Sequence, residues 1–272
     1  MKTRFAQIAR SGIKVTAAAA DLLAQPEPGI TILIYHRVGA GAGGQMDLDP
    51  QTFEEQVGWL VHTQRVISLD QAEAELRDGG TLRPAVVITF DDGTTDWVDH
   101  VLPTLERYKA PATFYVATDF VDRQVDFAGG GRPLSWAGLR ELAASPVVTI
   151  GSHTHRHLLL DRLQAHEVDA ELDRSIDLLR DRIGVDPSHF AYPKAVAGSP
   201  AAEAAVRERF STAVLAGTRA NPAGSDLHRL HRSPVQPADG SRWFRRKVAG
   251  GLHVEDDVRR LANRVRYRHA SS

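Results

Sequence analysis

The sequence predicts an α/β fold built on a parallel sheet, which is either open or closed into a barrel. Short apolar runs alternate six or seven times with segments of helical periodicity, and such alternation is typical of parallel sheets. No internal repeat, linker or break in composition divides residues 30–250. The 272 residues are therefore expected to form one large domain with short flanking segments.

The strands are predicted from short runs rich in β-branched and aromatic residues. Residues 30–35 (ITILIY) form the first run, and residues 85–90 (AVVITF) form the clearest one. Further strands are expected at residues 65–67, 112–117, 147–152, 189–193 and 211–216.

The helices are predicted from apolar residues that recur every three or four positions and from capping residues. One stripe marks a helix over residues 50–64 and consists of Phe53, Val57, Leu60 and Val61. A second stripe marks a helix that ends at Gly184 and consists of Val168, Leu172, Ile176, Leu179 and Ile183. Other helices are expected over residues 102–110 and 199–210, after Ser68 or Asp70, and after Ser135.

The overall composition is that of an ordinary globular protein, with 42% hydrophobic and 25% charged residues. The formal net charge is −1, so no nucleic-acid partner is expected. There is no cysteine, which excludes disulfides and thiolate metal ligands. The oligomeric state is not indicated by any feature of the sequence.

The two ends of the chain are rich in basic residues. Lys2, Arg4, Arg10 and Lys14 precede an alanine-rich stretch that Asp21 interrupts, and no convincing signal peptide results. We therefore expect a cytoplasmic or membrane-associated protein. Residues 241–272 contain nine Lys and Arg residues, which predict either a solvated helical tail or a contact with an anionic polymer or membrane surface.

An acidic pair, Asp91 and Asp92, follows the clearest strand and precedes Gly93. Chemistry in parallel α/β folds sits at the carboxyl ends of strands, and neither carboxylate can be buried without a metal, a basic partner or water. One aspartate capping the next segment is the simpler alternative. A phosphatase of the haloacid dehalogenase type is disfavoured, because its two aspartates are two positions apart.

Three histidines, His153, His155 and His157, follow the strand predicted at residues 147–152. On a strand all three would share one face, whereas on a helical turn only His153 and His157 would be neighbours. Imidazole suits zinc and related metals. Two histidines and one carboxylate would leave a coordination position open for water, as catalytic sites require.

The motifs TFDDG (89–93) and GSHTHRH (151–157), together with FAYP (190–193), resemble the polysaccharide deacetylase family, carbohydrate esterase family four. The resemblance covers about residues 30–235. It implies a deformed (β/α) barrel of about seven parallel strands. With that barrel over residues 30–240, residues 1–29 form an N-terminal helical or flexible segment and residues 241–272 a basic helical tail.

The resemblance also implies metal-dependent removal of N-acetyl groups from an oligo- or polysaccharide. Asp91 becomes the general base, and the metal ligands become Asp92, His153 and His157. The divalent metal is expected to be zinc, with cobalt or nickel as alternatives.

Further residues are assigned to the site by the same resemblance. The backbone N–H of Lys194 is the candidate for stabilising the oxyanion. Thr154 supports the metal-binding loop, and the substrate-binding candidates are Thr154, Tyr192, Trp136 and His36. The two-histidine turn becomes the favoured geometry, with His155 free to face solvent or substrate.

Two departures from the family pattern concern catalysis. Ala191 and Lys194 stand where the family has the arginine and tyrosine of Arg-x-Pro-Tyr, so the usual partner of the base is missing. The late Leu-x-His element that supplies the general acid is also missing, and His231, His36 or Asp91 are candidates for that role. An O-acetyl esterase and a non-catalytic glycan-binding barrel remain alternative functions.

Overall fold

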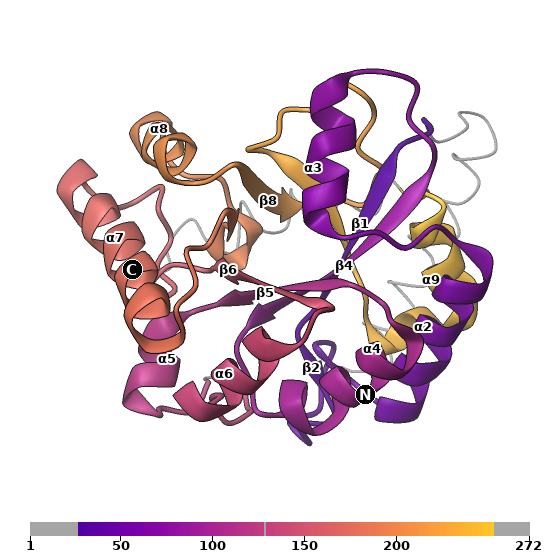
Figure 1. Cartoon of the computed structure of the whole chain (residues 1–272), viewed down its shortest axis with the longest axis horizontal. Helices are drawn as coiled ribbons and strands as arrows, with labels where there is room; N and C mark the ends of the chain where they lie inside the picture. Colours follow the sequence, from indigo (N-terminus) through magenta and orange to yellow (C-terminus); the bar gives the residue numbers. More distant parts are fainter. Residues whose placement is uncertain (1–26, 128, 253–272) are drawn as a thin grey trace, which may run out of the picture.

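The computed structural model describes residues 27–127 and 129–252. Seven parallel strands close into a barrel in the order β1-β4-β5-β6-β7-β8-β9, and β9 pairs with β1 to complete it (Figure 1). The barrel strands are β1 (Ile30–Tyr35), β4 (Ala85–Asp92), β5 (Ala112–Val116), β6 (Val148–Ser152), β7 (His189–Ala191), β8 (Thr212–Ala216) and β9 (Leu230–Pro234). The predicted (β/α) barrel of seven parallel strands is thus confirmed.

Helices surround this barrel and connect its strands (Figure 1). The α-helices are α2 (Pro50–Thr63), α3 (Leu69–Asp78), α4 (Leu102–Tyr108), α5 (Thr118–Arg123), α6 (Trp136–Ala144), α7 (Ala165–Ile183), α8 (Pro200–Arg209) and α9 (Gly240–Val248). Three short elements are a π-helix, η1 (Trp97–Val101), and the 3₁₀ turns η2 (Pro193–Ala195) and η3 (Pro237–Asp239). A small parallel pair, β2 (Arg37–Val38) and β3 (Asp47–Leu48), lies outside the barrel. Within the described residues, no helix is long and apolar enough to cross a membrane.

Capping residues set several helix boundaries as the sequence predicts. Ser68 accepts the N–H of Gln71 and completes a capping box at the start of α3. Ser135 accepts the N–H of Gly138 at the start of α6. Gly184 ends α7 in the left-handed conformation, with φ of 71°, which costs a glycine little.

The structure differs from the sequence prediction at three places. Residues 65–67 form only an isolated bridge from Val66 to Val86 instead of a strand. Val61 is 37% exposed, so it lies at the edge of the apolar stripe of α2. β9 was not predicted, because it is a short polar segment (LHRSP) with a buried arginine, Arg232, in place of an apolar run.

The strand register brings the predicted site residues to one end of the barrel. Asp92 of β4 pairs with Val116 of β5, Val116 with Ser152 of β6, and Ser152 with Phe190 of β7. These residues lie at or next to the carboxyl ends of four adjacent strands. The segments that follow β4, β6 and β7 therefore meet above the same edge.

Alternation along β4 separates the two aspartates. Phe90 points out of the barrel into an aromatic cluster, where it stacks on Phe114 with ring centroids 4.8 Å apart. Asp91 consequently points into the barrel, and Asp92 points to the other side of the strand. The two adjacent carboxylates therefore face different surroundings.

Candidate active site

The carboxylate of Asp92 and the imidazoles of His153 and His157 form a cluster of metal-ligating groups. One ligand atom from each lies within 4.8 Å of the other two. Asp92 Oδ1 is 3.9 Å from His153 Nε2 and 3.7 Å from His157 Nε2. Asp92 ends β4, whereas both histidines lie in the loop that follows β6. The structure thus brings together the three residues that the sequence predicts as ligands.

The loop after β6 is irregular and is not the helical turn that the sequence favoured. Thr154 and His157 both have left-handed backbone conformations, with φ of 65° and 59°. Thr154 Oγ1 accepts the backbone N–H of His157 at 3.0 Å and fixes the bend. The two rings end 4.8 Å apart at their centroids. The pair meets because of this side-chain-stabilised bend rather than through i, i+4 helical spacing.

The protonation of His153 is arranged to leave one ring nitrogen available. Its Nδ1 donates to the carbonyl oxygen of Ala191 at 2.7 Å, which directs the Nε2 lone pair toward Asp92. Burial lowers the pKa of His153 to about 4, so the ring is neutral near pH 7. Burial, and then the charge of Lys194, lowers the pKa of His157 to about 4 as well. One carboxylate oxygen and two neutral imidazoles fit zinc or a neighbouring divalent metal.

Asp91 is held by an arginine that the sequence analysis missed. Arg232 Nη1 and Nη2 donate to Asp91 Oδ1 and Oδ2 at 2.6 and 2.7 Å, and Arg232 is fully buried. Burial alone would raise the pKa of Asp91, but the charge and hydrogen bonds of Arg232 outweigh it and hold the pKa at about 2. β9 therefore supplies the basic partner that Ala191 does not provide.

A second arginine that the sequence analysis missed, Arg37, lies beside the other oxygen of Asp92. Its Nη2 is 3.7 Å from Asp92 Oδ2, and the side chain is 4% exposed. Nη1 donates to the carbonyl of Gly129 at 3.1 Å. An added Cβ at Gly131, which has a φ of 93°, would lie 2.9 Å from Arg37 Nε. The glycine-rich loop, which contains Gly129, Gly130 and Gly131, thus fits around the guanidinium, and the guanidinium links that loop to a candidate metal ligand.

Left-handed backbone conformations gather around this cluster. The non-glycine residues concerned are Asp92, Thr154, His157, Lys194 and Ala195. Such conformations cost on the order of 1 kcal/mol or more each, and they persist where surrounding contacts impose them, often at functional sites. The strain in three separate segments supports a site at this end of the barrel.

His36 and Lys194, two other predicted residues, lie near the cluster. Burial is the largest influence on the pKa values of Asp91 and His157, and the charge of His36 is a smaller influence on both. His36 therefore lies within electrostatic range of both groups. Lys194 is exposed in η2, and its charge also lowers the pKa of His157. Lys194 therefore lies within electrostatic range of His157.

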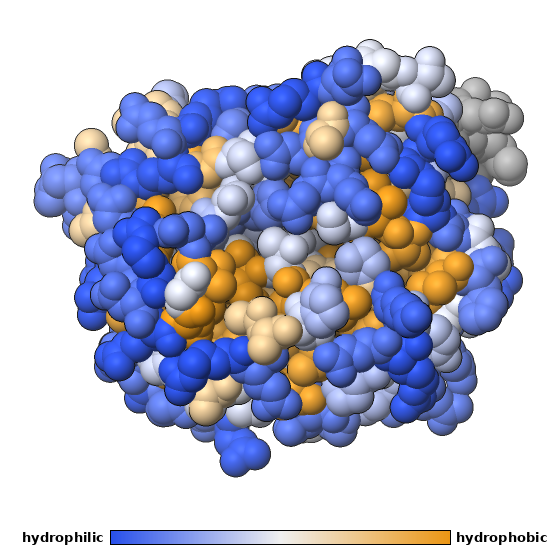
Figure 2. Space-filling model, viewed as in Figure 1, coloured by the Kyte–Doolittle hydropathy of each residue, from blue (hydrophilic) through white to orange (hydrophobic). Residues whose placement is uncertain are grey.

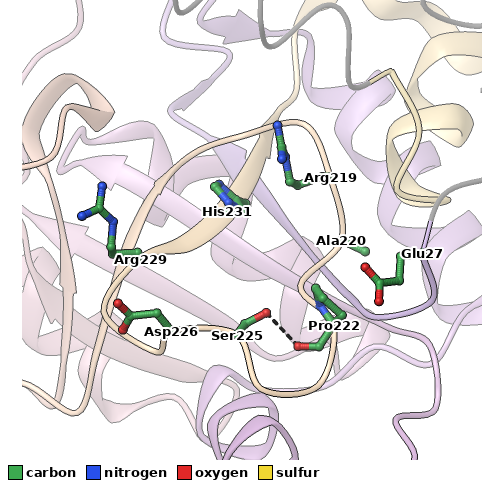
Figure 3. Close-up of a pocket in the computed structure, with 8 residues that line it drawn as sticks. All are labelled: Glu27, Arg219, Ala220, Pro222, Ser225, Asp226, Arg229 and His231. Carbon is green, nitrogen blue, oxygen red and sulfur yellow. Dashed lines mark hydrogen bonds between the residues drawn. The ribbon is translucent and has the colours of Figure 1, made fainter. Parts of the chain in front are cut away.

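His231 lies elsewhere and is a correction to the sequence analysis. It precedes Arg232 in β9, so its side chain faces the opposite side of the strand. Its ring packs against Gly217 and lines a pocket of about 380 Å³ (Figure 3). The other lining residues are Glu27, Arg219, Ala220, Pro222, Ser225, Asp226 and Arg229. Sequence reasoning could not see which face of an unpredicted strand each residue occupies.

Two of the candidate substrate-binding residues, Tyr192 and Thr154, are fully buried, and a third, Trp136, is partly exposed. Tyr192 is fully buried in a hydrophobic cluster, with its ring 5.1 Å from that of Phe190. Thr154 is fully buried within the loop that carries the histidines. Trp136 begins α6, where its Nε1 donates to Asp122 Oδ1 at 3.1 Å. Tyr192 and Thr154 thus support the structure, and Trp136 links α6 to α5.

His155, predicted to face solvent or substrate, instead joins the histidine loop to α5. Its Nδ1 lies 3.0 Å from Thr118 Oγ1, and its Nε2 lies 3.5 Å from Asp119 Oδ1. The backbone N–H of Asp119 donates to the carbonyl of His155 at 2.9 Å. His155 therefore braces the loop that carries the two candidate ligands.

Comparison with known proteins relates part of the chain to one family. The family model described as polysaccharide deacetylase matches residues 78–209, which contain Asp91, Asp92 and both candidate ligand histidines. Over this segment the chain is similar to the polysaccharide deacetylase family. His36, Arg37 and Arg232 lie outside the matched segment.

Curated proteins that are similar to this chain include two bacterial ones. It is 26% identical over 211 residues to YxkH of Bacillus subtilis (strain 168), covering 76% of this chain and 72% of that protein. It is 31% identical over 144 residues to the poly-beta-1,6-N-acetyl-D-glucosamine N-deacetylase of Escherichia coli (strain K12). That match covers 47% of this chain and 21% of the Escherichia coli protein, so it concerns one part of a much longer chain.

Solved structures of other bacterial proteins share the fold of this chain. IcaB from Ammonifex degensii superposes with a TM-score of 0.70 at 24% identity, covering 80% of this chain and 98% of that one. The Streptococcus pyogenes deacetylase PplD, in complex with acetate, gives a TM-score of 0.66 at 22% identity, covering 78% and 94%. At these identities the likeness establishes the common barrel.

Proposed function

We propose that this protein is a divalent-metal-dependent hydrolase that removes N-acetyl groups from a glycan. The observation that carries the proposal is the placement of two unlike carboxylates at one strand end. Asp92 faces two neutral imidazoles, whereas the neighbouring Asp91 faces a buried guanidinium. One carboxylate can thus hold a metal while the other remains available for proton transfer.

The metal would be held by Asp92, His153 and His157, because these groups alone form such a cluster among the described residues. A bound divalent ion at such a site polarises a carbonyl group and lowers the pKa of water toward neutrality. Zinc is the first expectation from this donor set, with cobalt or nickel as alternatives.

The proton-transfer roles follow from the surroundings of Asp91 and His36. With a pKa of about 2, Asp91 is ionised at any working pH. It accepts a proton from the water that attacks the acetyl carbon, and Arg232 keeps its two oxygens in place. The C–N bond then breaks, His36 supplies the proton that the leaving amine requires, and acetate and a free amino sugar result. The backbone N–H of Lys194 remains the proposed donor to the oxyanion.

The N-acetyl linkage is favoured by one relative, whose name states N-deacetylation of poly-beta-1,6-N-acetyl-D-glucosamine. The same groups would also hydrolyse an O-acetyl ester, so a substrate panel is needed to separate the two activities. We expect N-acetylated β-1,6-glucosamine oligomers or other N-acetylated oligosaccharides to release acetate when the protein is loaded with zinc or cobalt.

The deciding experiment compares acetate release from N-acetylated oligosaccharides and from O-acetylated xylan, before and after chelation and metal return. The matched control is Asp91→Asn, which should retain the metal and release no acetate. Acetate from the O-acetylated polymer alone would identify an esterase. Stoichiometric metal without release from any substrate would indicate a glycan-binding barrel instead.

A further inference from the structure

The buried Lys247 of α9 bonds to Asp239 just before the helix and to β9 of the barrel, and the other basic residues of α9 lie outside. Lys247 is fully buried, and its Nζ donates to both carboxylate oxygens of Asp239 at 2.9 Å and to the carbonyl of Pro234 at 2.7 Å. Phe244 and Val248 are buried beside it. The ring of Phe244 meets Trp59 of α2 with centroids 5.9 Å apart. These contacts fix which face of α9 points outward.

The outward face of α9 is basic and carries no carboxylate. Arg242, Arg245 and Arg246 recur at spacings of three and four residues, so they share one side of the helix. With Ser241 and Ala249 they line a hollow of about 710 Å³. We call these five residues the α9 arginine face.

Several arginines elsewhere on the surface are paired with carboxylates, which distinguishes them from Arg242 and Arg245. Arg180 pairs with Asp186, Arg209 with Asp173 and Arg229 with Glu203. Within residues 27–127 and 129–252, neither Arg242 nor Arg245 lies in an ion pair. Their positive charge is therefore not neutralised by any described carboxylate.

Two tryptophans accompany these arginines. The guanidinium of Arg242 lies 4.6 Å from the ring centroid of Trp243, and that of Arg245 lies 5.1 Å from that of Trp59. Both indoles are partly exposed. Figure 2 shows hydrophilic and hydrophobic residues side by side over the α2 and α9 side of the molecule. Arginine combined with exposed tryptophan suits the headgroup region of a bilayer, where indole rings concentrate.

We propose that the α9 arginine face binds the phosphates of anionic phospholipids at a bilayer surface. The guanidinium fork matches phosphate geometry, and basic residues on amphipathic helices are attracted to anionic headgroups. α9 lies beside α2, across the barrel from α7 (Figure 1). The face therefore does not extend the segment that carries His153 and His157, which disfavours the glycan substrate as its occupant.

The test measures binding of the full chain to phosphatidylcholine vesicles with and without phosphatidylglycerol. We expect binding only to the anionic vesicles, weakened by salt. The double variant R242Q/R245Q should bind at least about tenfold more weakly, since each basic residue near the surface contributes to adsorption. The control R180Q/R229Q removes the same charge from a distant surface and should bind like the wild type. Unchanged binding by R242Q/R245Q would overturn the proposal.

Further arms distinguish the source of the phosphate and the partner. Inorganic phosphate at constant ionic strength should not release the protein from vesicles. Binding to heparin without binding to anionic vesicles would show a soluble polyanion as the partner and would overturn the proposal. Brominated lipids should quench tryptophan emission less in Trp243→Phe than in the wild type. Acetate release from soluble oligosaccharides should be unchanged in R242Q/R245Q, so this result is independent of the proposed enzymatic function.

Discussion

Arg232 extends from β9 into the barrel interior and donates hydrogen bonds to both carboxylate oxygens of Asp91, at 2.6 and 2.7 Å. Its Nη1 also donates to Thr89 Oγ1 at 3.0 Å. The guanidinium thus joins the strand that closes the barrel to the strand that carries the acidic pair. The ionisation of Asp91 depends on this contact, because burial alone would favour the neutral acid.

Arg232→Met should leave Asp91 buried without a partner and raise its pKa from about 2. Removing one member of a buried pair costs about 3–5 kcal/mol, measurable by denaturant unfolding. Because Asp91 must be ionised to accept a proton, the acidic limb of the kcat/KM profile should move to higher pH. Arg232→Lys keeps the charge and should move it less. An unmoved limb in Arg232→Met would contradict the role of Asp91 as base.

The wild-type protein should lose stability in acid through the same pair. The folded-state pKa of Asp91 is depressed from 3.8 to about 2. The contribution of Asp91 to the free energy of unfolding is on the order of 2 kcal/mol. It is present above the unfolded-state pKa and is lost as the pH falls from about 4 toward 2. Unfolding free energies measured over this range should fall less steeply in Arg232→Met. Equal slopes in the two proteins would show that other carboxylates dominate acid unfolding.

Asp92→Ala and His157→Ala should each abolish metal binding, because either change leaves only two ligands at the cluster. Metal content of the purified protein, measured by mass spectrometry after dialysis against zinc, checks this. His155→Ala should keep the metal, since His155 contacts Thr118 and Asp119 instead, and should lose only about 1 kcal/mol of stability. Stoichiometric zinc in His157→Ala would refute the ligand assignment.

Arg37→Met should alter the metal site without removing a ligand. Arg37 lies beside Asp92 Oδ2, the oxygen turned away from the histidines, and outer partners of metal ligands commonly change affinity by about 10–100-fold. We expect a metal dissociation constant raised about tenfold and a changed visible spectrum of the cobalt form. Arg123→Gln, an exposed arginine paired with Asp119, is the matched control. An unchanged cobalt spectrum in Arg37→Met would limit Arg37 to holding the glycine-rich loop.

His36→Gln should lower kcat by about 10²–10⁴-fold if His36 protonates the leaving amine. His231→Gln should leave kcat unchanged, because His231 lines a separate pocket. Steady-state rates on an N-acetylated oligosaccharide, at equal metal content, compare the two variants. A substrate with a better leaving group should partly restore the His36→Gln rate. The reverse ranking of the two variants would return the acid role to His231.

The fold was predictable from the sequence wherever a buried element consists of apolar residues. Local residue types predict the strands over residues 30–35 and 85–90 and the caps at Ser68 and Ser135. β9 was not predictable in this way, because its inward-facing residue is a charged arginine, Arg232, whose partner lies 141 positions away in the sequence. Local periodicity carries no information about a charge satisfied at that separation.

The candidate site was predictable in the same uneven way. Asp91, Asp92, His153 and His157 lie in short motifs at strand ends, where residue type and position are informative together. The positions of His231 in a separate pocket and of Tyr192 in the core were not predictable, because the direction of a side chain depends on strand register and packing. Arg37 follows the first strand directly, so its position beside the carboxyl edge could have signalled a role near Asp92.

The segment by which the family is recognised ends at residue 209, before β8 and β9 begin. Arg232, His36 and Arg37 all lie outside it. A relative that aligned only over that segment could retain both aspartates and both histidines and still lack the partner that ionises its base. A match to that segment therefore does not establish that the base is held ionised, and an inactive relative should be sought first by the loss of its closing strand.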